Sequence, residues 1–134
     1  MQAHGSFDLR VNNQVLIARI SGAWNEEESW LYFEKVKEVA QAIIDKPWAL
    51  LLLMDGWELG TPETERATKE MVKWVSINGL YKVAEVYKPS PLLQLHINRI
   101  VDDGSDEIER RHFIHEKEAI AWLAQEGFPT TQPA

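Results

Sequence analysis

Residues 48–54, WALLLLM, are the longest uninterrupted apolar run in this chain, and they decide how the rest of it folds. The run lacks the apolar and polar alternation of a half-buried strand. Periodicity alone would also allow a turn of buried helix, but the short length favours a strand covered on both faces, as in a parallel sheet. The run ends at Asp55, and Asp55 to Glu58 read as a loop before a charged helical pattern begins near Pro62. The sequence therefore predicts a central buried strand with a loop at its carboxyl end.

The segments that precede this run predict a hairpin and then a helix. Residues 6–12 and 14–22 alternate apolar and polar side chains, and a pair of asparagines between them suits a tight turn. Asn25 is a good N-cap, with Glu28 three residues later in the position of a capping-box partner. The helical spacing of apolar residues continues to residues 45–47, Asp-Lys-Pro, where we expect the helix to end.

The segments that follow predict helices alternating with strands. They are a helix from Thr61 and Pro62 to residues 78–79, a strand over 82–87, a helix from Ser90, an acidic loop over 102–109, a strand over 111–115 and a helix closed by Gly127. The order is β-β-α-β-α-β-α-β-α. Because helices joining strands make right-handed crossovers, we expect an α/β domain with a mainly parallel five-stranded sheet and an antiparallel strand at one edge. We assign residues 1–128 to this single domain and residues 129–134 to a flexible C-terminal tail.

Composition narrows the classes of function. The chain has no cysteine, which excludes disulfides, thiolate nucleophiles and cysteine-ligated metal centres and permits a reducing compartment. Its start does not read as a secretory signal, and residues 48–54 are far too few to cross a membrane, so we expect a soluble, cytoplasmic protein. The formal net charge of -7 would repel a phosphate backbone. We therefore expect no nucleic-acid partner and no membrane span.

Several stretches carry a resemblance to a known family. Residues 46–51, KPWALL, lead from a helix into the central strand, Asp55 closes that strand, and residues 119–123, AIAWL, follow Phe113 in the last helix. Together with the order of elements, they resemble the STAS domain of anti-sigma-factor antagonists and, more closely, the small bacterial SpoIIAA-like proteins. These are also described as related to the C-terminal part of the Sec14 lipid-transfer domains. The resemblance implies a SpoIIAA-like (STAS) fold, and because its residues pack the core, it implies little about activity.

The resemblance also implies a place for regulation. STAS regulators carry a phosphorylated serine where the second main helix begins, just beyond the central strand. Here that region has no Asp-Ser-Ser-Gly motif, and Thr61 is the hydroxyl in the matching place. Its role as an N-cap already explains Thr61, and a phosphate there would meet the carboxylates of Asp55, Glu58 and Glu63. Both interpretations of Thr61 stay open, with the N-cap favoured.

A candidate binding site follows from the expected direction of the strands. Ligands of open parallel sheets bind beyond the carboxyl ends of the strands. The candidate residues at or near that edge are Trp24, Asp55, Trp57, Glu58, Thr61 and Tyr87. One interpretation is a rim that offers aromatic and acidic groups to a partner or a ligand. The other is that Trp24 and Trp57 fold back over the helix ends and cover the core, because tryptophan is mostly buried.

Catalytic and metal-binding interpretations find little support. Asp55 and Glu58 could form a carboxylate pair for acid–base work, but no histidine or nucleophile accompanies them, and the usual role of such an aspartate is to bond backbone amides. His112 and His115 lie three apart on an expected strand, so they point to opposite faces, and His115 is better placed to cap the last helix. Residues 102–107 lack the spacing of a calcium loop. We predict no enzymatic activity, no metal and no cofactor.

Two hypotheses of function remain. The first is a non-enzymatic regulatory or protein-interaction module of the STAS type, which binds another protein through the rim. The second is the binding or sensing of a small apolar ligand or lipid in a Sec14-like pocket, motivated by the Sec14 relationship and by the aromatic residues at the edge. A homodimer is a further expectation, because edge strands and exposed tryptophans need cover.

Overall fold

The structure is a computed structural model, which describes residues 5–59, 62–88 and 108–131 of the chain. Its elements are β1 (Gly5–Asn12), β2 (Val15–Trp24), α1 (Glu26–Ala40), β3 (Trp48–Leu59), α2 (Pro62–Ile77), β4 (Leu80–Val86), β5 (Glu109–Phe113) and α4 (Glu116–Gln125). The helix expected from Ser90 and residues 102–107 of the expected acidic loop lie outside the described residues.

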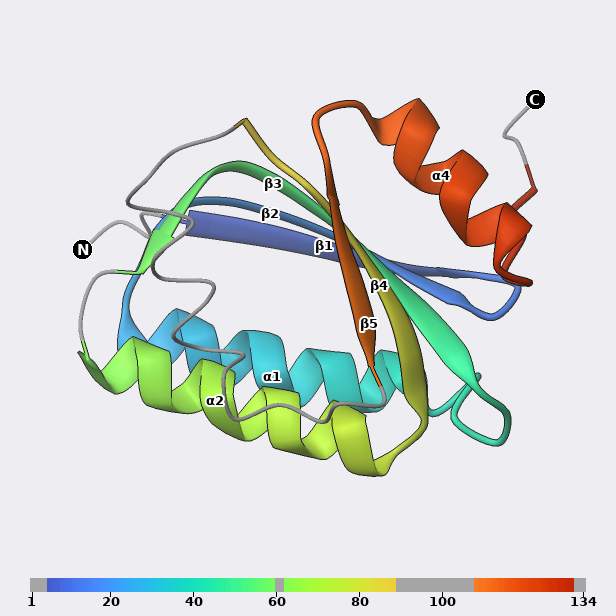
Figure 1. The fold of residues 1–134 in the computed structure, drawn as a ribbon. Helices are drawn as coiled ribbons and strands as arrows, with labels where there is room; N and C mark the ends of the chain where they lie inside the picture. Colours follow the sequence, from blue (N-terminus) through green and yellow to red (C-terminus); the bar gives the residue numbers. More distant parts are fainter. Residues whose placement is uncertain (1–4, 60–61, 89–107, 132–134) are drawn as a thin grey trace.

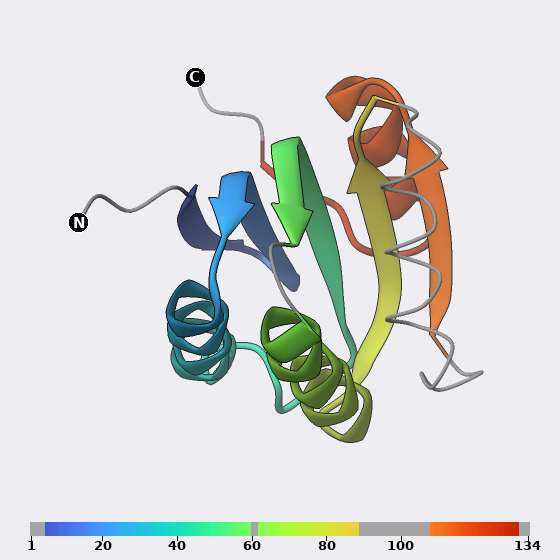
Figure 2. The same ribbon diagram turned by 90° about the vertical axis from the view of Figure 1, so that its left-hand side faces the viewer.

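The five strands form one sheet in the order β1-β2-β3-β4-β5. β1 pairs with β2 antiparallel, and the other three pairings are parallel. Helices α1 and α2 lie on one face of the sheet and α4 lies on the other (Figure 1). The view along the strands shows the same layers, with β3 in the middle of the sheet (Figure 2). The predicted mainly parallel sheet with one antiparallel edge strand is confirmed.

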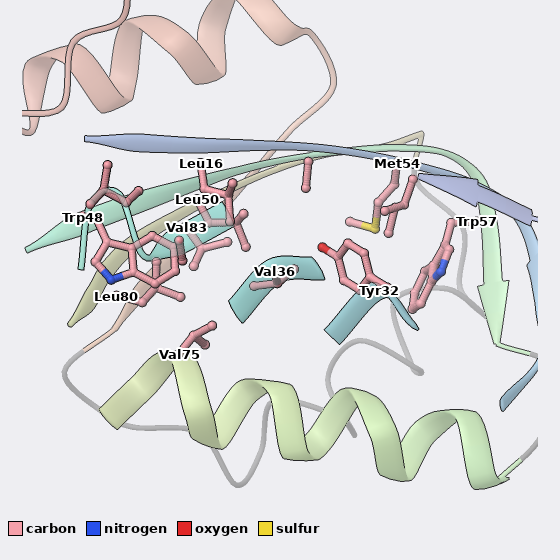
Figure 3. Close-up of a cluster of buried hydrophobic side chains, with 14 of the residues drawn as sticks. Leu16, Tyr32, Val36, Trp48, Leu50, Met54, Trp57, Val75, Leu80 and Val83 are labelled. Atoms are coloured by element: carbon pink, nitrogen blue, oxygen red, sulfur yellow. The ribbon is translucent and has the colours of Figure 1, made fainter. Parts of the chain in front are cut away.

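The position of β3 explains why residues 48–54 are apolar throughout. Trp48, Leu50 and Met54 face α1 and α2 in one core cluster (Figure 3). Leu51 and Leu53 face the opposite way and pack in a second cluster with residues of α4. Because both faces of the strand are buried, no position on it favours a polar side chain, and the alternation typical of a half-buried strand is absent.

The ends of the helices follow the predicted chemistry in part. The capping box at α1 is confirmed: Asn25 Oδ1 accepts the N–H of Glu28 at 2.9 Å, and the Glu28 carboxylate accepts the N–H of Asn25 at 3.4 Å. α1 ends at Ala40, several residues before the predicted end. The reason is a tight turn in which the N–H of Ile43 donates to the Ala40 carbonyl at 2.9 Å, so Ile43 stays in the core without continuing the helix.

The last helix begins and ends near the predicted residues. Gly127 has φ +99, and the N–H of Phe128 donates to the Leu123 carbonyl at 2.8 Å, which closes α4 over a buried ring. His115 occupies the N-cap position, but its side chain makes no capping hydrogen bond. The predicted position of His115 at the N-cap of the last helix is therefore confirmed, although its side chain adds no capping bond.

The main departure from the sequence prediction is at the carboxyl end of β3. Asp55 to Glu58, predicted as a loop, continue the strand, which pairs with β2 as far as Leu59. The register advances two residues on β2, from Ser21 to Ala23, while it advances three on β3, so β3 carries one extra residue. Gly56 takes φ +66, which glycine adopts without steric penalty. Pairing with β2 thus overrides the local turn preference of the Asp-Gly sequence, and a β-bulge takes the place of the loop.

The first residues of the expected flexible tail are held against the β1–β2 turn. Asn13 Nδ2 donates to the Pro129 carbonyl at 3.1 Å, and Asn12 Nδ2 donates to the Thr131 carbonyl at 3.1 Å. The N–H of Thr131 donates in return to Asn12 Oδ1 at 2.9 Å. Residues 129–131 are therefore attached to the domain, because the two asparagine amides satisfy their backbone groups.

Candidate functional site

The bulge at Gly56 sends the residues of the predicted rim to opposite faces of the sheet. In a regular strand Asp55 and Trp57 would share a face. The extra residue in β3 reverses the alternation after Gly56, so Trp57 joins Met54 on the face that packs against α1 and α2. Asp55 lies on the other face and is exposed. A single rim built from both residues, as one interpretation of the sequence predicted, is therefore not formed.

Trp24 and Trp57 belong to a buried aromatic cluster with Phe7 and Tyr32. The Trp24 ring centroid lies 6.2 Å from that of Trp57, 5.0 Å from that of Tyr32 and 5.8 Å from that of Phe7. Trp24 is 3% exposed and Trp57 is 7% exposed. Trp24 Nε1 donates to the Ser21 carbonyl at 2.8 Å, and Figure 3 shows Trp57 beside Tyr32 in the core. The interpretation in which these tryptophans cover the core describes the structure.

Tyr87 is also buried, in the same core cluster as Trp24 and Trp57, and it contacts His112 on β5. Its ring stacks on the ring of His112 at 3.9 Å between centroids, and its carbonyl lies 2.8 Å from His112 Nε2. These contacts join β5, a strand at the edge of the sheet, to the end of β4. Tyr87 therefore holds the edge of the sheet in place and does not face Asp55.

Across the sheet from the aromatic cluster, polar side chains line up over three strands. The register sets Ser6 opposite Ser21 and Ser21 beside Asp55, and the two hydroxyl oxygens lie 2.8 Å apart. In the next row Asp8 lies opposite Arg19. Because directly opposed residues share a face, these side chains form one surface.

We call this surface the polar face, and its members are Ser6, Asp8, Arg10, Arg19, Ser21 and Asp55. Arg10 Nε lies 3.0 Å from Asp8 Oδ2, and Arg19 Nη2 lies 3.3 Å from Glu116 Oε1 at the start of α4. α4 packs against β3, β4 and β5 (Figure 1), and Val15 at the start of β2 is buried in the same cluster. Among the described residues, the part of this side around Ser6, Ser21 and Asp55 stays open. The open part carries charges of both signs and hydroxyl groups, which suit hydrogen bonding to another surface.

The aromatic cluster contains polar atoms whose hydrogen bonding is incomplete. Trp57 Nε1 and Ser29 Oγ are buried and have no hydrogen-bond partner in the described structure. A buried donor left without a partner costs about 1–3 kcal/mol. Burial raises the pKa of Tyr32 far above its ordinary range, so its hydroxyl stays neutral. The cluster is thus apolar, with an indole N–H that has an unused capacity to donate.

The buried ionisable groups lie on β4 and β5, away from the polar face. Glu85 is 5% exposed, and burial raises its pKa, an effect opposed by Arg110, whose Nε lies 3.5 Å from Glu85 Oε1. A hydrogen bond to Glu109 raises the pKa of Lys82, which also lies 3.1 Å from Glu126. These ion pairs connect neighbouring strands and the end of α4. Because each pair connects neighbouring strands, both are interpreted as structural.

Two of the predicted features stay predictions. Glu58 is a residue of β3, but its side chain lies outside the described part of the structure. The distance between the carboxylates of Asp55 and Glu58 is therefore not defined. Thr61, the phosphorylation candidate, lies outside the described residues. Within residues 5–59, 62–88 and 108–131, no group of three or more histidine, aspartate or glutamate side chains could hold a metal ion. No helix in that same part of the chain is long and apolar enough to span a bilayer.

The serines of the polar face were missed by the sequence analysis. Ser6 and Ser21 occupy the polar positions of two alternating strands, so the pattern already places them on the face away from the core. Their contact with Asp55 depends on how three strands align, and the sequence pattern carries no register. Recognising the surface therefore required the paired sheet.

Comparisons with known proteins support the fold. The sequence matches no family model and no curated protein. It is similar in structure to an anti-sigma factor antagonist from Mycobacterium paratuberculosis, with a TM-score of 0.57, 11% identity and coverage of 90% of this chain and 94% of that one. It is also similar to an uncharacterized protein with a SpoIIAA-like fold from Shewanella loihica, with a TM-score of 0.61, 16% identity and coverage of 92% and 97%. The predicted SpoIIAA-like (STAS) fold is confirmed.

Proposed function

We propose that this chain, which has the SpoIIAA-like fold, is a non-enzymatic regulatory module that binds another protein through the polar face around Asp55. The observation that supports this most is the separation of the two sides of the sheet at the bulge. The aromatic groups are enclosed in the core, and the groups left exposed are hydroxyls and charges on an open sheet surface. An open surface of this kind suits contact with a second protein, and small molecules prefer concave sites.

The size of the polar face indicates what kind of contact it can make. Three strands about 4.8 Å apart, followed over about five residues, cover roughly 250 Å². A stable interface takes about 800 Å² from each partner, so the partner must also reach neighbouring elements or bind weakly. The start of α4 adjoins the polar face through the ion pair of Arg19 and Glu116. A regulated, reversible contact is consistent with this size.

The test is to reverse the charge of Asp55. Proteins captured from an extract by the wild-type chain would be identified, and their affinity for purified Asp55→Lys would be measured by calorimetry. We expect the affinity to fall at least about tenfold. The contact loses a carboxylate, and a positive group of the partner that pairs with Asp55 would meet a like charge. Asp45→Lys, which makes the same change at an exposed aspartate in the turn before β3, serves as the matched control and should bind normally. If every captured protein binds the Asp55 variant as tightly as the wild type, the proposal is wrong.

A second candidate function is the binding of a small apolar ligand in the aromatic cluster. It is favoured by Trp57 Nε1, a buried donor that has no partner among the described residues and would select a ligand that carries a carbonyl or carboxylate acceptor. Native mass spectrometry of freshly purified protein and titration with fatty acids would test it. Trp57→Phe keeps an aromatic ring but removes the donor, so it should bind such a ligand several-fold more weakly. A protein that is empty and indifferent to every fatty acid contradicts this candidate.

A further inference from the structure

We propose that two copies of this chain form a symmetric dimer in which β1 of one subunit pairs antiparallel with β1 of the other, so that one sheet runs through both. β1 is the outermost strand of the sheet, and within the described residues it pairs with β2 alone. It is eight residues long and pairs with β2 without a register shift. Its sequence, GSFDLRVN, holds no proline to block pairing. Such an edge attracts another strand unless something covers it.

The directions of the β1 backbone groups follow from two hydrogen bonds. The N–H of Ala49 on β3 donates to the Gln14 carbonyl at 2.9 Å. From Gln14 along β2, the backbone N–H and C=O groups of even-numbered residues therefore point toward β3, and those of odd-numbered residues point toward β1. The β1–β2 register then turns the N–H and C=O groups of Phe7, Leu9 and Val11 to the open edge. The N–H of Gly5, which has the same direction, donates to Glu28 Oε2 at 3.1 Å.

The charges on β1 specify a single register for self-pairing. When Leu9 lies opposite Leu9 of the partner subunit, Phe7 lies opposite Val11 of the partner subunit, and about six backbone hydrogen bonds become available. Asp8 then lies opposite Arg10 of the partner subunit, twice by symmetry. A shift by two residues in either direction sets Asp8 opposite Asp8 or Arg10 opposite Arg10. Opposed unlike charges stabilise a strand pair and like charges destabilise it, so the pairing centred on Leu9 is favoured.

The apolar groups along this edge agree with the same arrangement. Val11, which is 37% exposed, would be covered by Phe7 of the partner subunit. Leu31 is 51% exposed and follows Glu28 by one helical turn, so it flanks the edge where Glu28 bonds Gly5. α1 packs on β1 and β2, so the two α1 helices would lie about two strand spacings apart, roughly 10 Å. This is an ordinary distance between packed helices.

Symmetry favours a second copy over other ways to occupy the edge. Pairing β1 of one subunit with β5 of the next would leave a free edge at each end and build an open filament. Pairing β1 with β1 closes after two subunits. The dimer leaves Arg19, Ser21 and Asp55 accessible, so it does not depend on the proposed function and its failure would leave that proposal unaffected.

Sedimentation of the full-length chain over a range of concentrations tests the dimer. We expect twice the monomer mass of 15.4 kDa at high concentration. The single variants Arg10→Asp and Asp8→Arg should each weaken the dimer at least about tenfold, because like charges then meet across the interface. The double variant Asp8→Arg/Arg10→Asp restores unlike pairs and should dimerise as the wild type does. The wild-type side chains are 76% exposed for Arg10 and 53% for Asp8, so these changes should leave the fold intact.

Two further measurements decide the outcome. Lys117→Asp changes an exposed charge on α4 and should dimerise normally. Hydrogen exchange at the amides of Phe7, Leu9 and Val11 should slow as the protein concentration rises. A wild-type chain that stays monomeric up to about 1 mM overturns the proposal, as does a dimer that both single variants form with unchanged affinity. Protection that appears elsewhere and not at these three amides overturns it as well.

Discussion

Replacing Gly56 by alanine tests the bulge that separates Asp55 from Trp57. We expect Gly56→Ala to lower the free energy of unfolding by about 1 kcal/mol. A residue with a Cβ in the left-handed region costs about 1–2 kcal/mol, and the smaller entropy of the unfolded chain offsets about 0.4–1 kcal/mol of that. The backbone φ of Gly56 is +66, and a Cβ there would meet no atom within 4 Å. The loss is therefore conformational and does not come from a steric clash.

Urea denaturation followed by circular dichroism measures this loss, and the midpoint of thermal unfolding should fall by about 3–4 °C. Gly56→Asn is the matched control, because asparagine tolerates the left-handed region and should lose only a few tenths of a kcal/mol. Gly5→Ala provides the steric contrast. A Cβ at Gly5 would overlap Cδ1 and Nε1 of Trp24, so this variant should lose about 1–3 kcal/mol by overpacking.

Equal stability of Gly56→Ala and the wild type would refute the reasoning. The chain would then not need a positive φ at this position, and β3 would run without the extra residue. Asp55 and Trp57 would share one face, and the polar face and the aromatic cluster would no longer be separate surfaces. A change in tryptophan emission in the alanine variant would report the same rearrangement.

Three other predictions concern the caps and the buried charges. Asn25→Ala should lower the free energy of unfolding by about 1 kcal/mol through loss of the capping box, and a chemical denaturation midpoint equal to that of the wild type would contradict it. A hydrogen bond to Glu109 raises the pKa of Lys82, so its stabilisation is present at neutral pH and lost as pH rises through the raised pKa. The unfolding free energy of the wild type minus that of Lys82→Met should therefore fall only as pH rises above about pH 10, and a constant difference in urea titrations would exclude this role. Burial raises the pKa of Glu85 despite Arg110, so the folded state holds this proton more tightly than the unfolded chain, and stability falls as pH rises through that range. Relative to Glu85→Gln, the wild type should lose stability as pH rises above about pH 4, and parallel pH profiles of the two proteins would show that the carboxyl titrates normally.

Local patterns in the sequence identified the helices and strands because those patterns depend on neighbouring residues. The apolar run 48–54 identified a strand buried on both faces, and Asn25 with Glu28 identified the start of α1. The predicted ends of the helices were less accurate. Ile43 continues the helical spacing of apolar residues, but it lies in a turn after α1 and is buried there. Periodicity reports burial, and a buried residue need not be in the helix.

The sequence by itself determined the order of the described elements, the parallel sheet and the position of β3, because each follows from hydrophobic period and from the handedness of crossovers. Only the tertiary structure decided which face each candidate residue occupies. An Asp-Gly sequence favours a turn in isolation, yet pairing with β2 extends the strand through Gly56 and turns Trp57 into the core. That choice depends on contacts between segments far apart in the chain, and so does the alignment of Ser6, Ser21 and Asp55. A shift of one residue in register exchanges the two faces of a strand, so no reading of β3 alone could have placed the site.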